Sequence, residues 1–235
     1  MRGIALTFHL AGINNQNFLM RDDQTGTYWQ QISGRAIAGS LAGSQLELVP
    51  SDELSFALWR SGGGDGTVLK PVSGLVGEYA PKDWDVRMKR AKTVLNFPNS
   101  GLKSRDLVLG IDAFGVSRAY PVERLLRDLL TEDRLGGQPI LIVVGPDRKS
   151  LRVFKAPVHS EQAVSDYYRY TADTGKSLLM SAPLFVDSAS GSNWSFEGCA
   201  VSGPARGQCL SPVSSIKDYW FDWRNYHPQT TIFKR

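Results

Sequence analysis

The feature that most constrains this chain is an internal duplication. Residues 18–60 resemble residues 184–224, with glycine and tryptophan at matching positions. The identical pairs include Gly26/Gly191, Trp29/Trp194, Gly34/Gly198, Ala36/Ala200, Gly39/Gly203, Gly43/Gly207, Leu46/Leu210, Val49/Val213, Ser51/Ser215, Trp59/Trp223, Arg60/Arg224 and Thr67/Thr231. Self-similarity at a fixed spacing is the signature of a fold built from related units. The sequence therefore predicts two copies of one supersecondary unit.

Local patterns predict that each copy consists of short hairpins followed by a helix. Residues 18–21 and 27–32 flank the turn residues 22–26, and residues 36–38 and 45–48 predict a second hairpin. A strand is expected at 3–8 and a turn at 11–16, where Gly and Asn tolerate left-handed backbone. Ser51 and Ser215 are expected to be helix N-caps. Short strands at 67–69 and 231–233 would close the two units.

The segment between the copies predicts a further hairpin, helix and sheet. Residues 108–112 and 116–120 surround the turn-forming AFG, and Pro121 suits the first position of a helix that ends near residue 130. The apolar run 139–144 is expected to pair with 149–155, with the sequence DRLGGQ as the turn before it. Residues 159–177 predict a loop-rich insertion, and 178–180 a return to the sheet.

These elements indicate a β-rich α+β fold made of two related repeats. The expected division is a partial first repeat at 1–70, an inter-repeat segment at 71–105 and a complete second repeat at 106–235, all of which could form one unit. The first copy has no counterpart of residues 106–170. We therefore expect the chain to be truncated at its N-terminus, which would leave strand edges unpaired.

Composition excludes several classes of protein. The 235 residues include 42% hydrophobic and 21% charged residues, which is ordinary for a globular chain that buries a core. No apolar run reaches the roughly 18 residues that span a bilayer, and the N-terminus lacks the pattern of a signal peptide. The net charge is only +4. The basic run Lys82, Arg87, Lys89, Arg90 and Lys92 is interpreted as a solvated helix face, with an anion or nucleic-acid contact as the less favoured alternative.

Candidate ligand-binding residues lie where the first copy differs from the second. Gln30 and Gln31 are replaced by Ser195 and Phe196 in the second copy. The predicted binding set is Asn14, Asn15, Asp22, Trp29 and Gln30. Trp29 is interpreted chiefly as a core residue and only secondarily as a platform for a sugar ring. The repeated glycines indicate turns, because no Lys-Ser/Thr pair of a phosphate-binding loop follows them.

The histidines and cysteines form no pattern that indicates a metal site or a catalytic site. His9, His159 and His227 are scattered without a metal-ligand cluster, so each is interpreted as structural or exposed. No metal and no cofactor is expected, and no catalytic residue is assigned. Cys199 and Cys209 flank the second hairpin and are interpreted either as a disulfide or as two reduced core thiols. A disulfide would favour an extracytoplasmic location.

The motifs resemble those of a bacterial family, the domain of unknown function 3179. Its pattern D-x-x-T-G-S-x-W-x-Q is similar to residues 22–31, and G-x-A-x-x-G-x-x-x-G-x-x-L to residues 34–46. V-L-G-V-x-x-x-G-x-x-R-A-Y-P is similar to residues 108–121, and N-D-x-x-G-G-x-P-V-V-V to residues 132–144, with Glu132 in place of Asn. The C-P-L-C-like stretch of the family is absent, and residues 145–147 read Gly-Pro-Asp there. The resemblance implies an extracytoplasmic protein but no reaction.

The function expected from these observations is a non-catalytic binding or structural module of the bacterial cell envelope. Its partner would be a small molecule or an envelope protein. An enzyme with a polar site between the repeats is the main alternative. Nucleic-acid binding through residues 82–92 is the weaker one.

Overall fold

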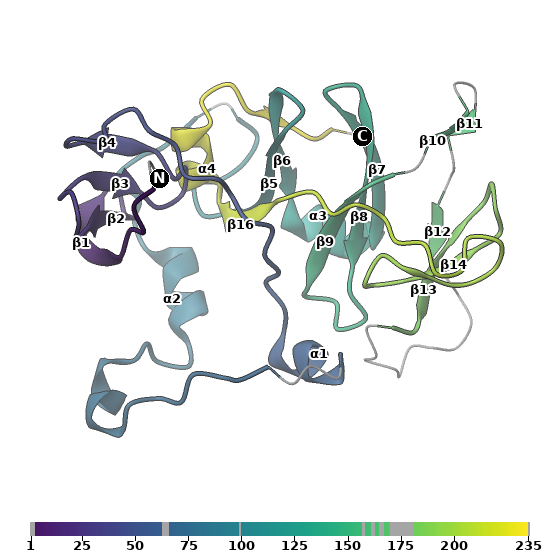
Figure 1. Ribbon diagram of the computed structural model, residues 1–235, viewed down its shortest axis with the longest axis horizontal. Coiled ribbons are helices and arrows are strands. Elements are labelled where there is room, and N and C mark those ends of the chain that lie inside the picture. Colours follow the sequence, from purple (N-terminus) through teal and green to yellow (C-terminus); the bar gives the residue numbers. More distant parts are fainter. Residues whose placement is uncertain are drawn as a thin grey trace.

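Small antiparallel sheets dominate the fold of the chain. The computed structural model describes residues 3–62, 66–98, 100–156, 158–160, 163–164, 167–169 and 181–234. Figure 1 shows the N-terminal sheet at one end, two sheets in the middle and another sheet at the far end. The predicted β-rich α+β class is confirmed. No helix among the described residues is long and apolar enough to cross a membrane.

The N-terminal sheet is a meander of four strands in sequence order. Its strands are β1 (Phe8–Asn14), β2 (Asn17–Asp22), β3 (Tyr28–Gln30) and β4 (Ala36–Ala38). Its small core contains Trp29, Ala36 and Leu41. Several large apolar side chains on β1 and β2 are exposed, among them Leu10, Ile13 and Phe18.

The central sheet has the order β16-β5-β6-β17 and separates two hydrophobic cores. Its strands are β5 (Leu107–Ala113), β6 (Val116–Pro121), β16 (Ile216–Tyr219) and β17 (Thr231–Ile232), of which β17 runs parallel to β6. Side chains alternate between the faces of a strand. Leu109 and Ile111 therefore face one core, while Val108 faces α4 (Trp220–Tyr226) on the other side.

The second middle sheet is buried on both faces. It contains β7 (Leu130–Leu135), β8 (Gln138–Val144) and β9 (Leu151–Lys155), and α3 (Val122–Asp128) joins it to β6. Ile140 and Ile142 of β8 pack with the central sheet, whereas Leu141 and Val143 pack with the sheet at the far end. This double burial explains why β8 is a continuous apolar run rather than an alternating one.

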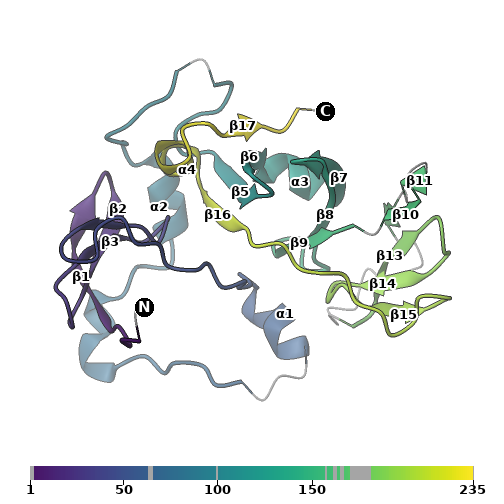
Figure 2. The same ribbon diagram turned by 45° about the horizontal axis from the view of Figure 1, so that its top comes forward.

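The C-terminal end sheet packs directly on the β7–β9 sheet. Its strands are β12 (Tyr167–Arg169), β13 (Pro183–Asp187), β14 (Asn193–Ser195) and β15 (Ala200–Ser202). Phe185, Trp194 and Phe196 are buried with Leu141 and Phe154. A two-stranded ribbon, β10 (Val158–Ser160) and β11 (Ala163–Val164), precedes it (Figure 2).

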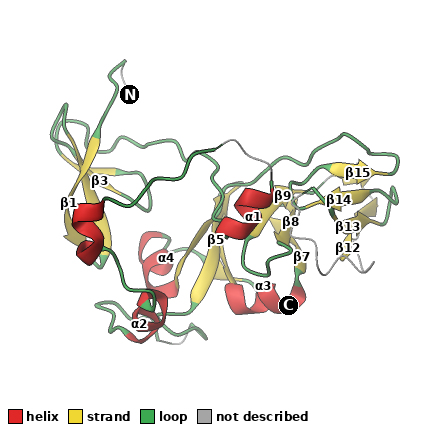
Figure 3. Cartoon of the chain, turned by 90° about the horizontal axis from the view of Figure 1, so that it is seen from below, coloured by secondary structure: helices red, strands yellow, loops and turns green. Residues whose placement is uncertain are grey.

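The remaining helices are short. They are α1 (Phe56–Ser61), the 3-10 helix η1 (Ser73–Glu78) and α2 (Trp84–Arg90). Leu58 of α1 is fully buried in the core that the β7–β9 sheet and the C-terminal end sheet share. Ion pairs from Asp52 to Arg152 and from Glu53 to Lys217 tie the segment before α1 to the two middle sheets. Figure 3 shows these helices beside the strands.

Most predicted hairpins are present, but several element boundaries are wrong. The first strand runs from Phe8 to Asn14, through the predicted turn, and the turn lies at Asn15 and Gln16, both with positive φ. The β1–β2 ladder extends to the pair of Asn14 and Asn17, so pairing outweighed the local turn preference of Gly and Asn. The predicted strands at 45–48 and 67–69 are not formed. Residues 178–180 lie outside the described residues.

Both predicted helix starts are also wrong. The N-cap of α1 is Ser55, whose hydroxyl accepts a hydrogen bond from the amide of Leu58. The predicted second helix begins four residues late, because residues 216–219 extend as β16 along β5. In both cases pairing or packing elsewhere in the chain decided where the helix begins, and Ser51 and Ser215 cap nothing.

The two end sheets contain matching hydrogen bonds. The hydroxyl of Thr27 accepts from the amide of Leu41, and the hydroxyl of Ser192 accepts from the amide of Ala205. A Cβ at Gly39 would lie 2.7 Å from the Cα of Thr27, and one at Gly203 would lie 2.6 Å from the Cα of Ser192. Both glycines have positive φ. The close approach of the backbone therefore requires glycine at both places. These matching contacts are consistent with the hypothesis of a repeat.

A disulfide joins Cys199 and Cys209, as one of the two sequence interpretations proposed. The two residues face each other as an isolated antiparallel bridge. At the corresponding position of the N-terminal sheet, Arg35 and Gln45 form the same bridge without a covalent link. The disulfide therefore reinforces a strand contact that the backbone also makes elsewhere without it.

We expect Cys209→Ser to lower the free energy of unfolding by about 3 kcal/mol. The crosslink closes a short loop, and loop-closure entropy lost from the unfolded chain gives a stabilisation of this size. Urea unfolding with and without reductant measures the effect. Reductant should destabilise the wild type and leave Cys209→Ser unchanged; equal curves for the wild type in both conditions would contradict the expectation.

Candidate ligand-binding cleft

The candidate site is a cleft of about 590 Å³ between the N-terminal sheet and the central sheet with α4. One wall comes from β3 and the loops around β4, including Gln30, Gln31 and Arg35. The other wall includes Gly110 and Asp112 of β5 with residues of and after α4. The cleft thus brings together polar side chains from two distant parts of the chain.

Gln30 and Gln31 lie on this wall at the end of β3. The hydroxyl of Ser33 donates to Oε1 of Gln30 at 2.7 Å, which orients its amide. Gln31 is exposed at the cleft. Its counterpart Phe196 is fully buried between the C-terminal end sheet and the β7–β9 sheet. The two end sheets thus face their neighbours differently, one across a polar cleft and the other across a dry core.

The opposite wall is defined by side-chain periodicity. Val108, Gly110 and Asp112 share the face of β5 that points to α4, because alternate residues of a strand share a face. Trp220 and Trp223 of α4 pack on that face. His227 follows α4 and stacks on Trp223, with ring centroids 3.6 Å apart.

His227 and Asp112 form a loose polar pair. Nε2 of His227 lies 3.7 Å from Oδ2 of Asp112. Nδ1 of His227 lies 3.1 Å from the carbonyl oxygen of Trp223. Burial lowers the pKa of His227 more than this carbonyl and the Asp112 charge raise it. The imidazole is therefore neutral at pH 7, where both Nε2 and the carboxylate accept hydrogen bonds.

The N-terminal sheet is fixed to α4 beside the cleft by its β1–β2 turn. Nδ2 of Asn17 donates to Oδ2 of Asp222 at 2.7 Å, and the Tyr226 hydroxyl approaches the carbonyl oxygen of Asn14 at 3.4 Å. Gln16 bonds the backbone at Lys92 and Val94. The predicted site residues Asn14 and Asn15 thus lie in a docking turn, next to the cleft rather than on its lining.

A pair of acidic side chains lies under this docking turn. Asp218 of β16 and Asp222 of α4 interact directly, and each retains a buried oxygen without a hydrogen-bond partner among the described residues. Burial, followed by the charge of Asp222, raises the pKa of Asp218 to about 7. Burial also raises the pKa of Asp222, against the hydrogen bond from Asn17 and the charge of Arg105. The pair therefore retains a proton well above the usual range of a carboxyl group.

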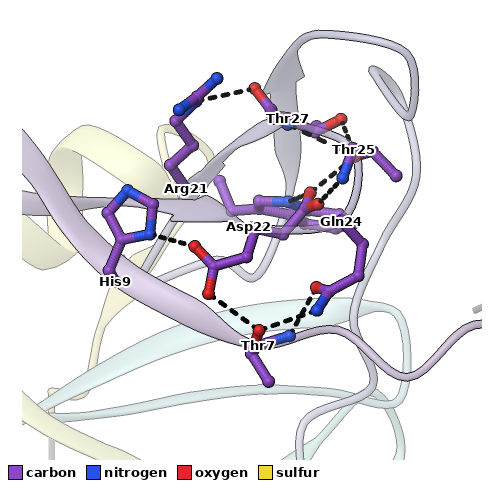
Figure 4. Close-up of polar contacts among 10 residues, drawn as sticks. Thr7, His9, Arg21, Asp22, Gln24, Thr25 and Thr27 are labelled. Atoms are coloured by element: carbon purple, nitrogen blue, oxygen red, sulfur yellow. Dashed lines mark hydrogen bonds and ion pairs between the residues drawn. The ribbon is translucent and has the colours of Figure 1, made fainter.

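Two predicted site residues form the interior of the N-terminal sheet. Asp22 and Trp29 are both fully buried. The indole Nε1 of Trp29 donates to Oδ2 of Asp22 at 2.9 Å, and the hydroxyl of Thr25 donates to the same oxygen at 2.8 Å (Figure 4). Burial raises the pKa of Asp22, but these hydrogen bonds outweigh it and keep the pKa below its usual value. The two residues hold the β2–β3 turn, and of the predicted set Gln30 lines the cleft.

An exposed pair of a histidine and an aspartate, His9 and Asp23, lies on the outer side of that turn. Nδ1 of His9 lies 2.6 Å from Oδ1 of Asp23, and both side chains are about half exposed. Thr7 bonds both Asp23 and Gln24 (Figure 4). His9 and Asp23 lie outside the lining of the cleft, unlike His227 and Asp112.

Other hollows are less suited to a ligand. A cavity of about 320 Å³ near β9 contains Arg152, whose guanidinium is already bound to Asp52 and to the carbonyl oxygen of Phe196. In the basic segment, Arg87 pairs with Asp83 on an exposed face of α2. The described residues contain no group of three or more His, Cys, Asp or Glu side chains placed to bind a metal.

Sequence reasoning interpreted His227 as structural or exposed, and it did not single out Asp112 or the pair of Asp218 and Asp222. The alternation at 108, 110 and 112 and the spacing of Trp220, Trp223 and His227 were available signals. Neither shows that the two patterns face each other. The helix predicted from Ser215 also placed Asp218 in a first turn, where it would be solvated.

The fold and the cleft define a β-rich α+β protein with a polar hollow beside one end sheet. The chain belongs to the family described as "Protein of unknown function (DUF3179)", which matches residues 2–230. The family resemblance seen in the sequence motifs is thereby confirmed. No curated protein and no solved structure matches the chain.

Proposed function

We propose that this protein is a non-catalytic binding module that holds a small polar ligand in the cleft between the N-terminal sheet and α4. The observation that carries the proposal is the contrast between the two end sheets. Where the C-terminal end sheet buries Phe196 in a dry core, the N-terminal sheet presents Gln31 to a hollow of about 590 Å³. Concave sites with a few convergent polar groups are the usual form of a small-molecule site.

The groups in the cleft favour a ligand without strong net charge. Gln30, Gln31 and Gln45 contribute neutral amides. The charged side chains Arg35, Glu47 and Asp112 include both signs. A strongly anionic or cationic ligand would meet a like charge, whereas a ligand rich in hydroxyl or amide groups would find donors and acceptors on both walls.

We further propose that the protein works in the cell envelope. The Cys199–Cys209 disulfide supports this location, since disulfides persist in oxidising compartments. The domain division proposed from the sequence, with residues 1–70 as one unit and 106–235 as another, would place the cleft at the junction of the units.

The alternative of an enzyme uses the same cleft, where a histidine and a carboxylate lie together. Conversion of a bound probe into product would favour it over a binding module. The weaker alternative, nucleic-acid binding through residues 82–92, would show as DNA binding that weakens with salt.

We expect Gln31→Ala to weaken binding of a cleft ligand about fivefold, which is the effect of one neutral hydrogen bond. The probes are maltotriose, the trimer of N-acetylglucosamine and N-acetyl-trialanine methylamide, with citrate as a strongly anionic probe that should not bind. Calorimetry on the full chain measures affinity, and two-dimensional NMR locates the perturbed residues.

The matched control is Gln208→Ala, an exposed glutamine outside the lining of the cleft. It should bind the probe as the wild type does. If none of the three neutral probes binds, or if Gln208→Ala weakens binding as much as Gln31→Ala, the proposed function is wrong.

A further inference from the structure

The position of His227 at the end of α4 determines which nitrogen of its ring carries hydrogen. The backbone amide of His227 donates to the carbonyl oxygen of Trp223 at 2.9 Å. Nδ1 of the same residue lies 3.1 Å from this oxygen. A carbonyl oxygen only accepts hydrogen bonds, so Nδ1 must be the protonated nitrogen. In the neutral ring, Nε2 then presents a lone pair to the cleft.

Nε2 faces a second acceptor rather than a donor. It lies 3.7 Å from Oδ2 of Asp112, too far for a direct hydrogen bond. A neutral imidazole nitrogen and a carboxylate oxygen also both lack a hydrogen to share. Nε2 and Oδ2 can therefore form hydrogen bonds here only with donor groups that enter the cleft.

The ring is held rigidly in this orientation. It stacks on the indole of Trp223 with an interplanar angle of 16°, and only 12% of its side chain is exposed. Nε1 of Trp223 in turn donates to the hydroxyl of Thr230 at 2.9 Å. An acceptor held in place by stacking and hydrogen bonding loses little entropy when a ligand binds.

The charged side chains around the cleft have opposite effects on the protonation of His227. Asp112 of β5 favours the protonated ring. On the opposite wall, the charge of Glu47 would favour it and that of Arg35 would oppose it. Tyr226 on α4 is neutral at pH 7, because burial raises the pKa of its hydroxyl. Burial of the ring is the dominant effect and keeps His227 neutral.

We propose that Nε2 of His227 and the carboxylate of Asp112 together accept the hydroxyl hydrogens of a polyhydroxylated ligand, such as a sugar, in this cleft. This inference rests on the proposed function and names its ligand class. Vicinal hydroxyl groups supply two donors a few ångströms apart, which matches two acceptors 3.7 Å apart. An amide ligand without hydroxyl groups offers single, separated donors.

The test compares hydroxylated and hydroxyl-free probes on the full chain. Maltotriose and the trimer of N-acetylglucosamine are the hydroxylated probes, and N-acetyl-trialanine methylamide is the hydroxyl-free one. We expect at least one sugar to bind the wild type, and His227→Phe, which keeps an aromatic ring on Trp223, to weaken it about tenfold. Asp112→Asn should weaken it by a smaller factor, because the amide retains one acceptor.

The control is His9→Phe, the same substitution in the exposed His9–Asp23 pair, which lies outside the lining of the cleft. It should leave sugar binding unchanged. Because burial lowers the pKa of His227 from the usual 6.5, binding by the wild type should weaken only at pH values below 6.5, where a protonated Nε2 donates instead of accepting. Nitrogen NMR of the wild type provides a readout that does not depend on the folding of a variant. At pH 7 it should show hydrogen on Nδ1 and a bare Nε2 whose signal shifts when the sugar is added.

The outcomes separate the two proposals. If the tripeptide binds in the cleft and no sugar does, the ligand class is wrong while the proposed function stands. If a sugar binds equally well to His227→Phe, or if Nε2 carries hydrogen at pH 7, the role of His227 is wrong. If no probe binds, both proposals fail.

Discussion

Asp218→Asn is expected to be more stable than the wild type by up to about 4 kcal/mol above pH 8, and equal to it near pH 4. The pKa of Asp218 is about 7 in the folded protein, against 3.8 for an unperturbed side chain. This difference corresponds to a free energy of about 4 kcal/mol once the pH exceeds both values. Asparagine keeps the shape and one acceptor for the amide of Tyr219, but it has no proton to lose.

The direction of the pH dependence of stability follows from proton binding. Between pH 4 and pH 7 the folded protein keeps a proton that the unfolded chain releases, so this group stabilises the fold at low pH. The stabilisation is lost as the pH rises toward the folded pKa, because two carboxylates then face each other and Arg105, Asn17 and the amide of Tyr219 offset their repulsion only in part. The wild-type curve of stability against pH should therefore fall across this range relative to that of the variant.

Urea unfolding at pH 4, 6 and 8.5 measures the difference. The matched control is Asp83→Asn, which removes an exposed carboxylate paired with Arg87 and should change stability by about 0.5 kcal/mol or less at each pH. Parallel curves for Asp218→Asn and the wild type would show that the pair does not hold its proton. A destabilised variant at pH 8.5 would contradict the expectation outright.

The sequence predicted the parts of the fold that local pattern determines. The hairpin of β5 and β6 surrounds a turn with positive φ at Phe114 and Gly115, and its two strands pair continuously from Val108 and Pro121 to Ala113 and Val116. The run 139–144 was recognised because a strand buried on both faces is apolar throughout. These signals lie within a few residues of each other, so one stretch of chain contains all the information.

The parts that could not be predicted depend on contacts between distant segments. Residues 216–219 form a strand because they pair with the edge of β5. As a consequence, α4 begins after Asp218. The same pairing placed Asp218, partly buried, beside the buried Asp222, so that their carboxyl groups interact. His227 and Asp112 are more than 100 residues apart in the sequence, and only the packing of α4 on β5 brings them together. The local sequence contains no trace of that contact.

Gly110→Ala is expected to lower the free energy of unfolding by about 4 kcal/mol and to abolish ligand binding in the cleft. A Cβ on Gly110 would lie 2.3 Å from the Trp223 ring, on which His227 also stacks. Trp223 is 1% exposed and packs with Val108, Ala119 and Trp220, so its ring cannot move away from Gly110 without disturbing this core. Overpacking of this kind costs about 1–3 kcal/mol. Loss of the buried bond from Trp223 to Thr230 adds about 1–3 kcal/mol more.

The effect should be specific to this position rather than to strand glycines in general. Gly12→Ala is the matched control, because a Cβ on Gly12 of β1 has no atom within 4 Å and its φ is not positive. It should be neutral or slightly stabilising, since alanine loses less backbone entropy on folding than glycine. Thermal and urea unfolding of both variants measure stability, and near-ultraviolet circular dichroism reports the tryptophan environment. If Gly110→Ala folds with wild-type stability and an unchanged tryptophan signal, then Trp223 does not pack on β5 as described. The orientation of His227 in the cleft would fail with it, because the imidazole takes its position from that indole.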